Sequence, residues 1–290
     1  MELALPYRLA DPEHGAVDDL IDVERHPLCG AEARRSAAEA RARLDRDGAV
    51  RLPGFLRQTA LTDIATDIAK RAVHAPIRRH RAGAYHRSAP LDDGASPLPE
   101  LEWLAGHVTR DMLPCYTAAQ RLYVSPTFKR WVADVVGLDR VYEYADPLAG
   151  LVATILPPGG AYPWHYDTNE FVLTIPLQTA ERGGRFEYHR DLRTPGDENL
   201  DGLRRIVSGD GPPPRLVPAS PGDLIVFRGR YSLHQVSRVE GTRSRHVLVL
   251  SYADRPDVIG PLDRTRSVYG RVTERHLLAA GTTSADGLIL

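Results

Sequence analysis

The second half of this chain contains short apolar segments that recur about every ten residues and are separated by glycine- and proline-rich turns. From residue 141 onward we predict strands over residues 150–156, 165–167, 171–177, 183–188, 221–227 and 245–252. Short strands with regularly spaced turns are typical of two antiparallel sheets that pack face to face. We therefore predict a mainly β fold with some α structure: a double-stranded β-helix (jelly roll) with N-terminal and flanking helices.

The first half of the chain has a different pattern. Apolar residues recur at helical spacing over residues 59–73, and residues 49–52 alternate like a strand. Helices are also predicted over residues 31–47, which are rich in Ala, Arg and Glu and precede Gly48, and over residues 128–136, which lie between a helix-start signal and Gly137. Residues 78–99 are predicted to form a loop, residues 100–122 to contain helical structure with a break or kink at Pro114, and residues 199–211 to form a later helix or an irregular excursion. We predict one domain over residues 1–290, with a mostly helical part (1–140), a jelly-roll core (141–255) and a C-terminal tail (256–290).

Charge and cysteine content exclude several classes of protein. The net charge of -1 gives no basis for binding nucleic acid or an anionic membrane surface. Two cysteines form neither a zinc motif nor a disulfide framework, and no signal peptide or membrane-spanning segment is apparent. The sequence therefore predicts a cytoplasmic protein that acts on a small molecule and is compatible with a homodimer.

One motif has the spacing of a metal site. In a strand, residues i and i+2 point to the same side, so His165 and Asp167 can reach one ion. His234, from a distant predicted strand, can complete the set. Two imidazoles and one carboxylate on one face of an octahedral Fe(II) leave the opposite face open for a cosubstrate and O2.

Arginines follow the third candidate ligand. A guanidinium binds a carboxylate with two parallel hydrogen bonds, which suits a dicarboxylate cosubstrate such as 2-oxoglutarate. Arg243 and Arg245 lie two residues apart, so strand alternation places both on the same side and cannot choose between them. Thr154, on the strand before the metal motif, is a further candidate contact to the cosubstrate.

Taken together, these motifs resemble the Fe(II)/2-oxoglutarate-dependent dioxygenase superfamily over about residues 35–255, and in particular its phytanoyl-hydroxylase-like members. The resemblance is strongest to the hydroxylating relatives of free-amino-acid halogenases. It rests on Tyr142-x-Tyr144-x-Asp146-Pro147-Leu148-Ala149, Trp164-His165-Tyr166-Asp167-x-Asn169-Glu170-Phe171, Gly183-Gly184-x-Phe186-x-Tyr188 and Gly229-Arg230-x-Ser232-Leu233-His234.

The resemblance implies both a reaction and roles for the residues. Halogenases of that branch carry glycine at the carboxylate position, so Asp167 favours hydroxylation over halogenation. The eleven-residue offset from His234 favours Arg245 over Arg243. The implied reaction is oxidative decarboxylation of 2-oxoglutarate by O2 to succinate and CO2. It would be coupled to hydroxylation, desaturation or cyclisation at an unactivated C–H bond of a free amino acid or close derivative.

Residues that contact the substrate are also implied. Glu143 is a candidate partner for a substrate ammonium, and Tyr162, Thr168 and Asn169 are candidates for the pocket wall. Arginines on the predicted loop are candidates for binding an α-carboxylate, and the tail over residues 254–271 for closing over the site. The loop arginines are Arg78, Arg79, Arg81 and Arg87.

Two other classes of function use the same residues. One is a non-catalytic jelly-roll protein that binds a metal or a small molecule. The other is a hydrolytic zinc enzyme, although zinc sites more often include additional His or Cys ligands.

Overall fold

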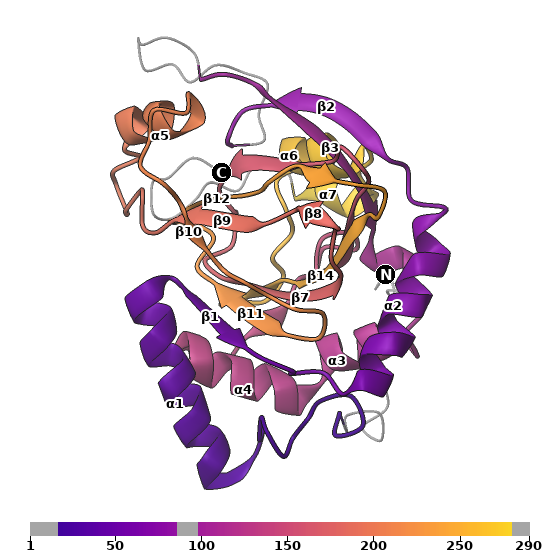
Figure 1. Ribbon diagram of the computed structural model, residues 1–290. Coiled ribbons are helices and arrows are strands. Elements are labelled where there is room, and N and C mark those ends of the chain that lie inside the picture. Colours follow the sequence, from indigo (N-terminus) through magenta and orange to yellow (C-terminus); the bar gives the residue numbers. More distant parts are fainter. Residues whose placement is uncertain (1–16, 86–97, 280–290) are drawn as a thin grey trace.

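The computed structural model describes residues 17–85 and 98–279 and contains two antiparallel sheets (Figure 1). The larger sheet has the order β1 (Ala49–Leu52), β11 (Leu224–Phe227), β7 (Val172–Gln178), β14 (Arg245–Leu250), β5 (Leu151–Leu156), β3 (Leu101–Val108) and β2 (Arg78–Ala82). The smaller sheet has the order β10 (Arg215–Leu216), β9 (Phe186–His189), β12 (Leu233–Val236) and β6 (Tyr162–His165). Two further pairs join β13 (Val239–Glu240) to β8 (Arg182–Gly183) and β15 (Tyr252–Ala253) to β4 (Tyr142–Glu143). The predicted jelly-roll core is confirmed.

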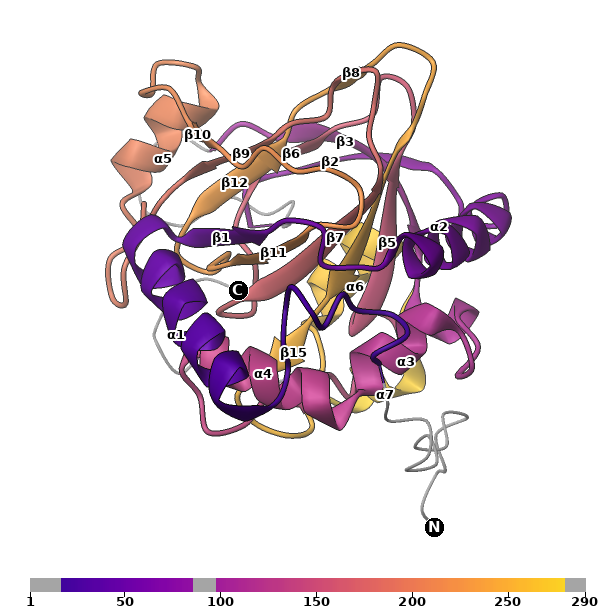
Figure 2. The same ribbon diagram turned by 60° about the horizontal axis from the view of Figure 1, so that its bottom comes forward.

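Four helices cover the outer face of the larger sheet: α1 (Gly30–Asp47), α2 (Gln58–Ala72), α3 (Ala118–Val124) and α4 (Pro126–Val136). Figure 2 shows α1 and α4 side by side under β1 and β11. Both have clear end signals in the sequence, because α1 stops at Gly48 in the left-handed conformation and the Ser125 hydroxyl caps α4. Their buried faces join the outward side chains of the sheet in the main core.

Strand alternation separates this core from the interior of the jelly roll. On β14, Leu248 and Leu250 point outward into the helical core, whereas Val247 and Val249 point inward and line a cavity. The neighbouring β5 repeats the pattern, with Ala153 outward and Val152, Thr154 and Leu156 inward. Strands β5 and β14 therefore each contribute one row of side chains to the helical core and one to the cavity.

Several boundaries differ from those predicted. Residues 78–99 and 100–122 were predicted as loop and helix, but they contain β2 and β3, and helical structure is limited to a 3-10 turn (Arg110–Met112) and the start of α3. Residues 86–97 of the predicted loop lie outside the described residues. Local propensity failed here because β3 pairs with β5 on one side and β2 on the other, and these hydrogen bonds override the helix-forming Leu, Ala and Glu residues. The larger sheet thus takes three of its strands, β1, β2 and β3, from the first half of the chain.

The remaining predictions for the core need smaller changes. The predicted strand over residues 183–188 is interrupted at Gly183 and Gly184, which both have positive φ. Strand β6 ends at His165, so Asp167 lies just beyond the strand. The segment over residues 199–211 contains helix α5 (Leu200–Val207), which the Asn199 side chain caps. No helix among the described residues has the length and apolar character needed to cross a bilayer.

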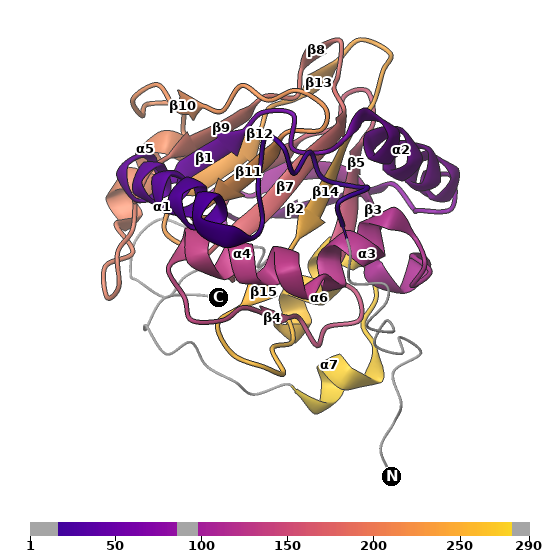
Figure 3. The same cartoon turned by 90° about the horizontal axis from the view of Figure 1, so that it is seen from below.

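The C-terminal segment packs back onto the fold through α6 (Leu262–Tyr269) and α7 (Glu274–Leu278). Figure 3 shows both helices, in yellow, next to β4 and β15. The Asp146 carboxylate is buried between them: it accepts hydrogen bonds from the backbone N–H of Gly260 (3.0 Å) and from His276 Nε2 (2.9 Å). It also accepts from the N–H groups of Leu148 (2.7 Å) and Ala149 (2.9 Å). One carboxylate thus fixes the segment that carries α6.

Replacing Asp146 with Asn is expected to lower the free energy of unfolding by about 2 kcal/mol, because charge-assisted hydrogen bonds in a buried site are lost. Burial raises the pKa of Asp146, but the hydrogen bonds from His276 and the backbone outweigh this effect, and the net pKa is lowered. The contribution is therefore present above the unfolded pKa, about 3.9, and is lost as pH falls through the lower folded pKa. Urea denaturation as a function of pH measures both effects.

The control for this prediction is Asp263→Asn, which changes an exposed carboxylate on α6. It should leave the free energy of unfolding within about 0.5 kcal/mol of the wild-type value. A penalty for Asp146→Asn that stays constant down to pH 2 would contradict the ionised carboxylate as its source.

Candidate metal centre

Two histidines face each other across the smaller sheet. His165 on β6 and His234 on β12 are direct partners in the antiparallel register, and their ring centroids are 4.0 Å apart. Asp167 follows β6 by two residues, and its Oδ2 lies 3.5 Å from His234 Nε2. One potential ligand atom from each of the three side chains lies within 4.8 Å of the other two. The structure therefore brings the three predicted ligands together.

Backbone carbonyls fix which nitrogen of each histidine faces the centre. Pro163 O lies 2.7 Å from His165 Nδ1, and Ser232 O lies 3.0 Å from His234 Nδ1. A carbonyl only accepts, so each Nδ1 carries the proton of its neutral ring and each Nε2 carries the lone pair. Burial lowers the pKa of both histidines, and for His165 the neighbouring His234 lowers it further. Neutral imidazoles with unprotonated Nε2 atoms are the form that binds a metal ion.

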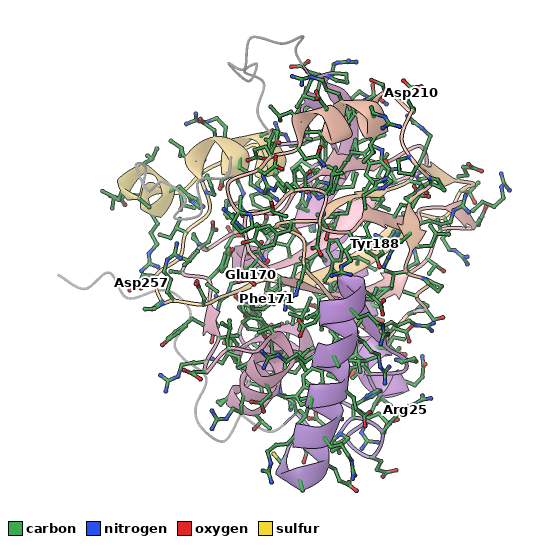
Figure 4. All side chains as sticks on the ribbon, turned by 90° about the vertical axis from the view of Figure 1, so that its left-hand side faces the viewer. Arg25, Glu170, Phe171, Tyr188, Asp210 and Asp257 are labelled. Carbon is green, nitrogen blue, oxygen red and sulfur yellow. The ribbon has the colours of Figure 1, made fainter. Side chains whose placement is uncertain are left out.

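The segment that carries Asp167 is attached to the connection between β11 and β12. The Asp167 N–H donates to Gly229 O (3.0 Å), and Arg230 donates to Thr168 O (2.7 Å). Arg228 pairs with Glu170 (3.0 Å) and also with an aspartate of α1. Figure 4 shows Glu170 and Phe171 near the C-terminal end of α1. These contacts hold the carboxylate even though it lies outside the strand.

Gly229 leaves the space that this carboxylate needs. A Cβ atom on residue 229 would collide with Asp167 Oδ2. The backbone therefore approaches the carboxylate at a distance that only glycine allows. The Gly-Arg pair that precedes His234 in the sequence thus has a steric role at the site.

The donor set fits a divalent metal ion. Asp167 Oδ2 is buried and forms no hydrogen bond with the described residues, whereas Oδ1 faces Arg264 Nη2 at 3.6 Å. A buried carboxylate oxygen without a hydrogen-bond partner is costly unless a cation binds it. Two neutral imidazoles and one carboxylate on one side of an ion are the donor set preferred by non-haem Fe(II).

A cavity of about 440 Å3 opens between the two sheets beside this triad. Arg245, the first residue of β14, lines it and forms no hydrogen bond or ion pair with the described residues. Burial lowers the pKa of Arg245 to about 10, a value that still leaves it charged at neutral pH. A Cβ atom built on Gly184 would lie 3.1 Å from Arg245 Cδ, so the absence of a side chain there gives the aliphatic stem room. A desolvated guanidinium facing a cavity is suited to bind a carboxylate.

Strand position separates the two candidate arginines. Arg243 precedes β14, is exposed and donates to Ala180 O (3.4 Å), and it does not line the cavity. Thr154 does line the cavity, directly opposite Val247 in the β5–β14 register. The geometry therefore favours Arg245 and leaves Thr154 within the same cavity.

The candidate substrate residues divide into two groups. Tyr162, Thr168 and Asn169 line the cavity near the triad. Glu143 does not: its carboxylate is bound by Arg110 (2.8 Å) and Lys129 (2.8 Å) outside the cavity. The expected contact between Glu143 and a substrate ammonium is therefore not supported, because two cations already neutralise this carboxylate.

The arginines predicted to cap a substrate bind other parts of the protein. Arg78 donates to Ser267 O (2.8 Å) at the end of α6, and Arg79 pairs with Glu102 (2.7 Å). Arg81 donates to Glu100 O (2.8 Å), and Arg87 lies outside the described residues.

The structure adds wall residues that the sequence did not single out as contacts. His107 on β3 lines the cavity, its buried Nε2 has no hydrogen-bond partner among the described residues, and burial lowers its pKa to about 3. Tyr144 and Arg264 also line the cavity. No spacing rule could find His107, because β3 was predicted as a helix. The prediction that the tail covers the site agrees with the position of α6.

No protein-family model matches the sequence, and no curated protein does. Several solved structures share its fold. An oxidoreductase of the 2OG-Fe(II) oxygenase family from Burkholderia pseudomallei is 19% identical, with 76% of this chain and 91% of that chain covered and a TM-score of 0.51. AviO1 from Streptomyces viridochromogenes Tue57 is 18% identical, with 78% and 98% covered and a TM-score of 0.53.

A third similar structure is the non-haem α-ketoglutarate-dependent epimerase SnoN from nogalamycin biosynthesis. It is 18% identical, with 76% of this chain and 81% of that chain covered and a TM-score of 0.53. A second SnoN structure contains Fe3+, α-ketoglutarate and nogalamycin RO. This chain thus has the fold of the 2OG-Fe(II) oxygenase family, as the sequence motifs predicted.

Proposed function

We propose that this protein is an Fe(II)/2-oxoglutarate-dependent oxygenase. The observation that carries the proposal is the presence, in one cavity, of the His165–Asp167–His234 triad and of the Arg245 guanidinium, which has no polar partner among the described residues. The fold supports it, because SnoN, which shares that fold, has been solved with Fe3+ and α-ketoglutarate.

The metal and the cosubstrate would be bound by different residues of the cavity. His165, Asp167 and His234 would hold Fe(II), which supplies O2 activation and the oxidation of a C–H bond when bound. Arg245 would hold the distal carboxylate of 2-oxoglutarate, and the Thr154 hydroxyl lies in the same cavity to hydrogen-bond to it. The apolar rows of β5 and β14 exclude water, which strengthens each of these polar contacts.

For the substrate we propose a free amino acid or close derivative, which would be hydroxylated, desaturated or cyclised. The resemblance to amino-acid-modifying oxygenases and the positions of Tyr162, Thr168 and Asn169 beside the triad support this choice. A cytoplasmic location is supported by the free thiols Cys29 and Cys115. A homodimer stays a prediction.

Neither of the two other functions, a non-catalytic binding protein and a hydrolytic zinc enzyme, explains the position of Arg245. A protein that only binds a metal needs no desolvated guanidinium beside the ion. A hydrolytic zinc enzyme needs a water-filled site, whereas apolar side chains from both sheets dominate this cavity.

Release of succinate from 2-oxoglutarate tests the proposal. Wild-type protein with Fe(II), ascorbate, O2 and the twenty amino acids in turn should form succinate together with a product heavier by about 16 Da or lighter by about 2 Da. The mass differences correspond to hydroxylation and to desaturation or cyclisation. No succinate under any of these conditions, with metal bound, would exclude the oxygenase.

Replacing Arg245 with Gln should raise the KM for 2-oxoglutarate about 10- to 100-fold, since a charge-assisted contact is worth about 1.5–3 kcal/mol. Arg243→Gln is the matched control and should leave KM unchanged, because Arg243 is exposed outside the cavity. Steady-state succinate assays measure both values, and a larger effect of Arg243→Gln would reverse the assignment.

A further inference from the structure

One face of α6 forms a wall of the cavity. Its contributions, Arg264, Thr265, Val268 and Tyr269, occur at i, i+1, i+4 and i+5, which places them on a single helical face. The opposite side of the helix carries Arg266, which is exposed. The sequence of α6 therefore orients the helix, with Arg264 facing the cavity and Arg266 facing solvent.

Arg264 is held in a fixed position beside the metal ligands. Its Nη1 donates to Tyr166 O (3.1 Å), and its Nη2 lies 3.6 Å from Asp167 Oδ1. A guanidinium has five N–H groups, and these contacts use a minority of them. Arg264 forms no other hydrogen bond with the part of the chain that the structure describes, so donors remain for a ligand in the cavity.

The charges that line the cavity favour an anion. Among the described lining residues, Asp167 is the only carboxylate, while Arg185, Arg245 and Arg264 are cationic. Arg185 is exposed and lies near Glu187, so the guanidinium groups within the cavity are those of Arg245 and Arg264. The charges of Fe(II) and 2-oxoglutarate cancel, and Asp167 balances one guanidinium. One positive charge is left uncompensated.

The second arginine is not needed by the cosubstrate. Arg245 extends from β14 in the larger sheet, whereas Arg264 extends from α6 and lies against Asp167. With 2-oxoglutarate on Arg245, the guanidinium of Arg264 is free for another anion. His107, whose Nε2 has no partner in the described part of the chain, contacts Tyr269 of the same wall, with ring centroids 5.3 Å apart.

We propose that α6 is the substrate-binding wall and that Arg264 binds the carboxylate of a small carboxylic acid substrate. The proposal rests on the proposed oxygenase function, and it adds that the substrate carries a carboxylate by which the protein recognises it. The carboxylate on Arg264 places the carbon chain of the substrate beside the triad, between Tyr162 and Tyr269. His107 offers an uncharged polar contact to the same molecule.

The test compares acids with their amides. The anaerobic protein, loaded with Fe(II) and 2-oxoglutarate, is titrated by calorimetry with the twenty L-amino acids, their N-acetyl derivatives and the α-carboxamides of both sets. In the wild type, an acid should bind at least 10-fold more tightly than its carboxamide. Arg264→Gln should remove this preference by lowering the affinity for the acid without changing the affinity for the amide. Arg264→Lys should restore part of the preference.

Arg266→Gln is the matched control, since it removes a guanidinium from the outer face of the same helix. It should keep the preference for the acid. The proposal is overturned if Arg264→Gln keeps the preference, if acids and amides bind equally in the wild type, or if no acid of the panel binds. Failure of the proposed function is recognised separately, because Fe(II) and 2-oxoglutarate would then not bind before any titration.

Discussion

Replacing Asp167 with alanine is expected to lower succinate formation by at least about 1,000-fold while leaving the fold intact. The metal supplies several kcal/mol of stabilisation to the reaction, and each 1.36 kcal/mol is a factor of ten in rate. Asp167 is the only anionic group of the triad, so its removal lowers affinity for a divalent cation. The apo-protein should tolerate the change, because Asp167 lies at the cavity surface and not in the helical core.

The effect of Asp167→Ala on metal binding is measured by thermal unfolding with and without Fe(II). In the wild type, Fe(II) under anaerobic conditions should raise Tm, because a ligand that binds only the folded state stabilises it. Asp167→Ala should show a Tm that hardly responds to Fe(II). Asp201→Ala, which removes an exposed carboxylate on α5, should behave like the wild type. Unchanged metal binding in Asp167→Ala would remove this residue from the centre.

Replacing Gly229 with alanine should weaken metal binding and turnover about 100- to 1,000-fold, although no ligand is changed. The added Cβ takes the place of Asp167 Oδ2, so the carboxylate must move away from the two histidines. Partners that orient metal ligands are typically worth 10- to 100-fold, and a direct collision should reach or exceed that range. Fe(II) titration and succinate assays measure the loss.

The control for this variant is Gly106→Ala on β3. There the nearest atom to the added Cβ is the terminal methyl of Ile77, a flexible and exposed side chain that can move aside. We expect near-normal metal binding from Gly106→Ala and, in both variants, a Tm within a few degrees of the wild type. Normal metal affinity in Gly229→Ala would show that the Asp167 carboxylate can bind from another position.

Most of the core could be predicted from periodicity, and the exceptions have a common cause. Strands β5, β7, β11 and β14 combine apolar segments with glycine or proline turns, which are local signals. The edge strand β2 is rich in arginine, and β3 consists largely of residues with no strand preference. They are strands because β5 pairs with β3 and β3 in turn pairs with β2, and neither segment alone encodes pairing with a distant segment.

The same distinction applies to the site. The spacing of His165 and Asp167 predicted a shared metal ion even though Asp167 lies beyond β6, because the contacts to Gly229 and Arg230 keep it in place. The choice between Arg243 and Arg245 could not be made by alternation, since both face one side. It depended on where β14 begins. Glu143 could not be assigned either, because its partners Arg110 and Lys129 come from other elements.

The sequence by itself determined the fold class and the three candidate ligands, since these depend on residue identity and on short-range periodicity. Only the tertiary structure decided which charges face the cavity. It placed Glu143 outside, brought His107 in through β3, and set Arg264 against Asp167 through the return of α6. The physical reason is that strand pairing and helix docking join residues that are distant in sequence, and the charge of a pocket is a property of that assembly.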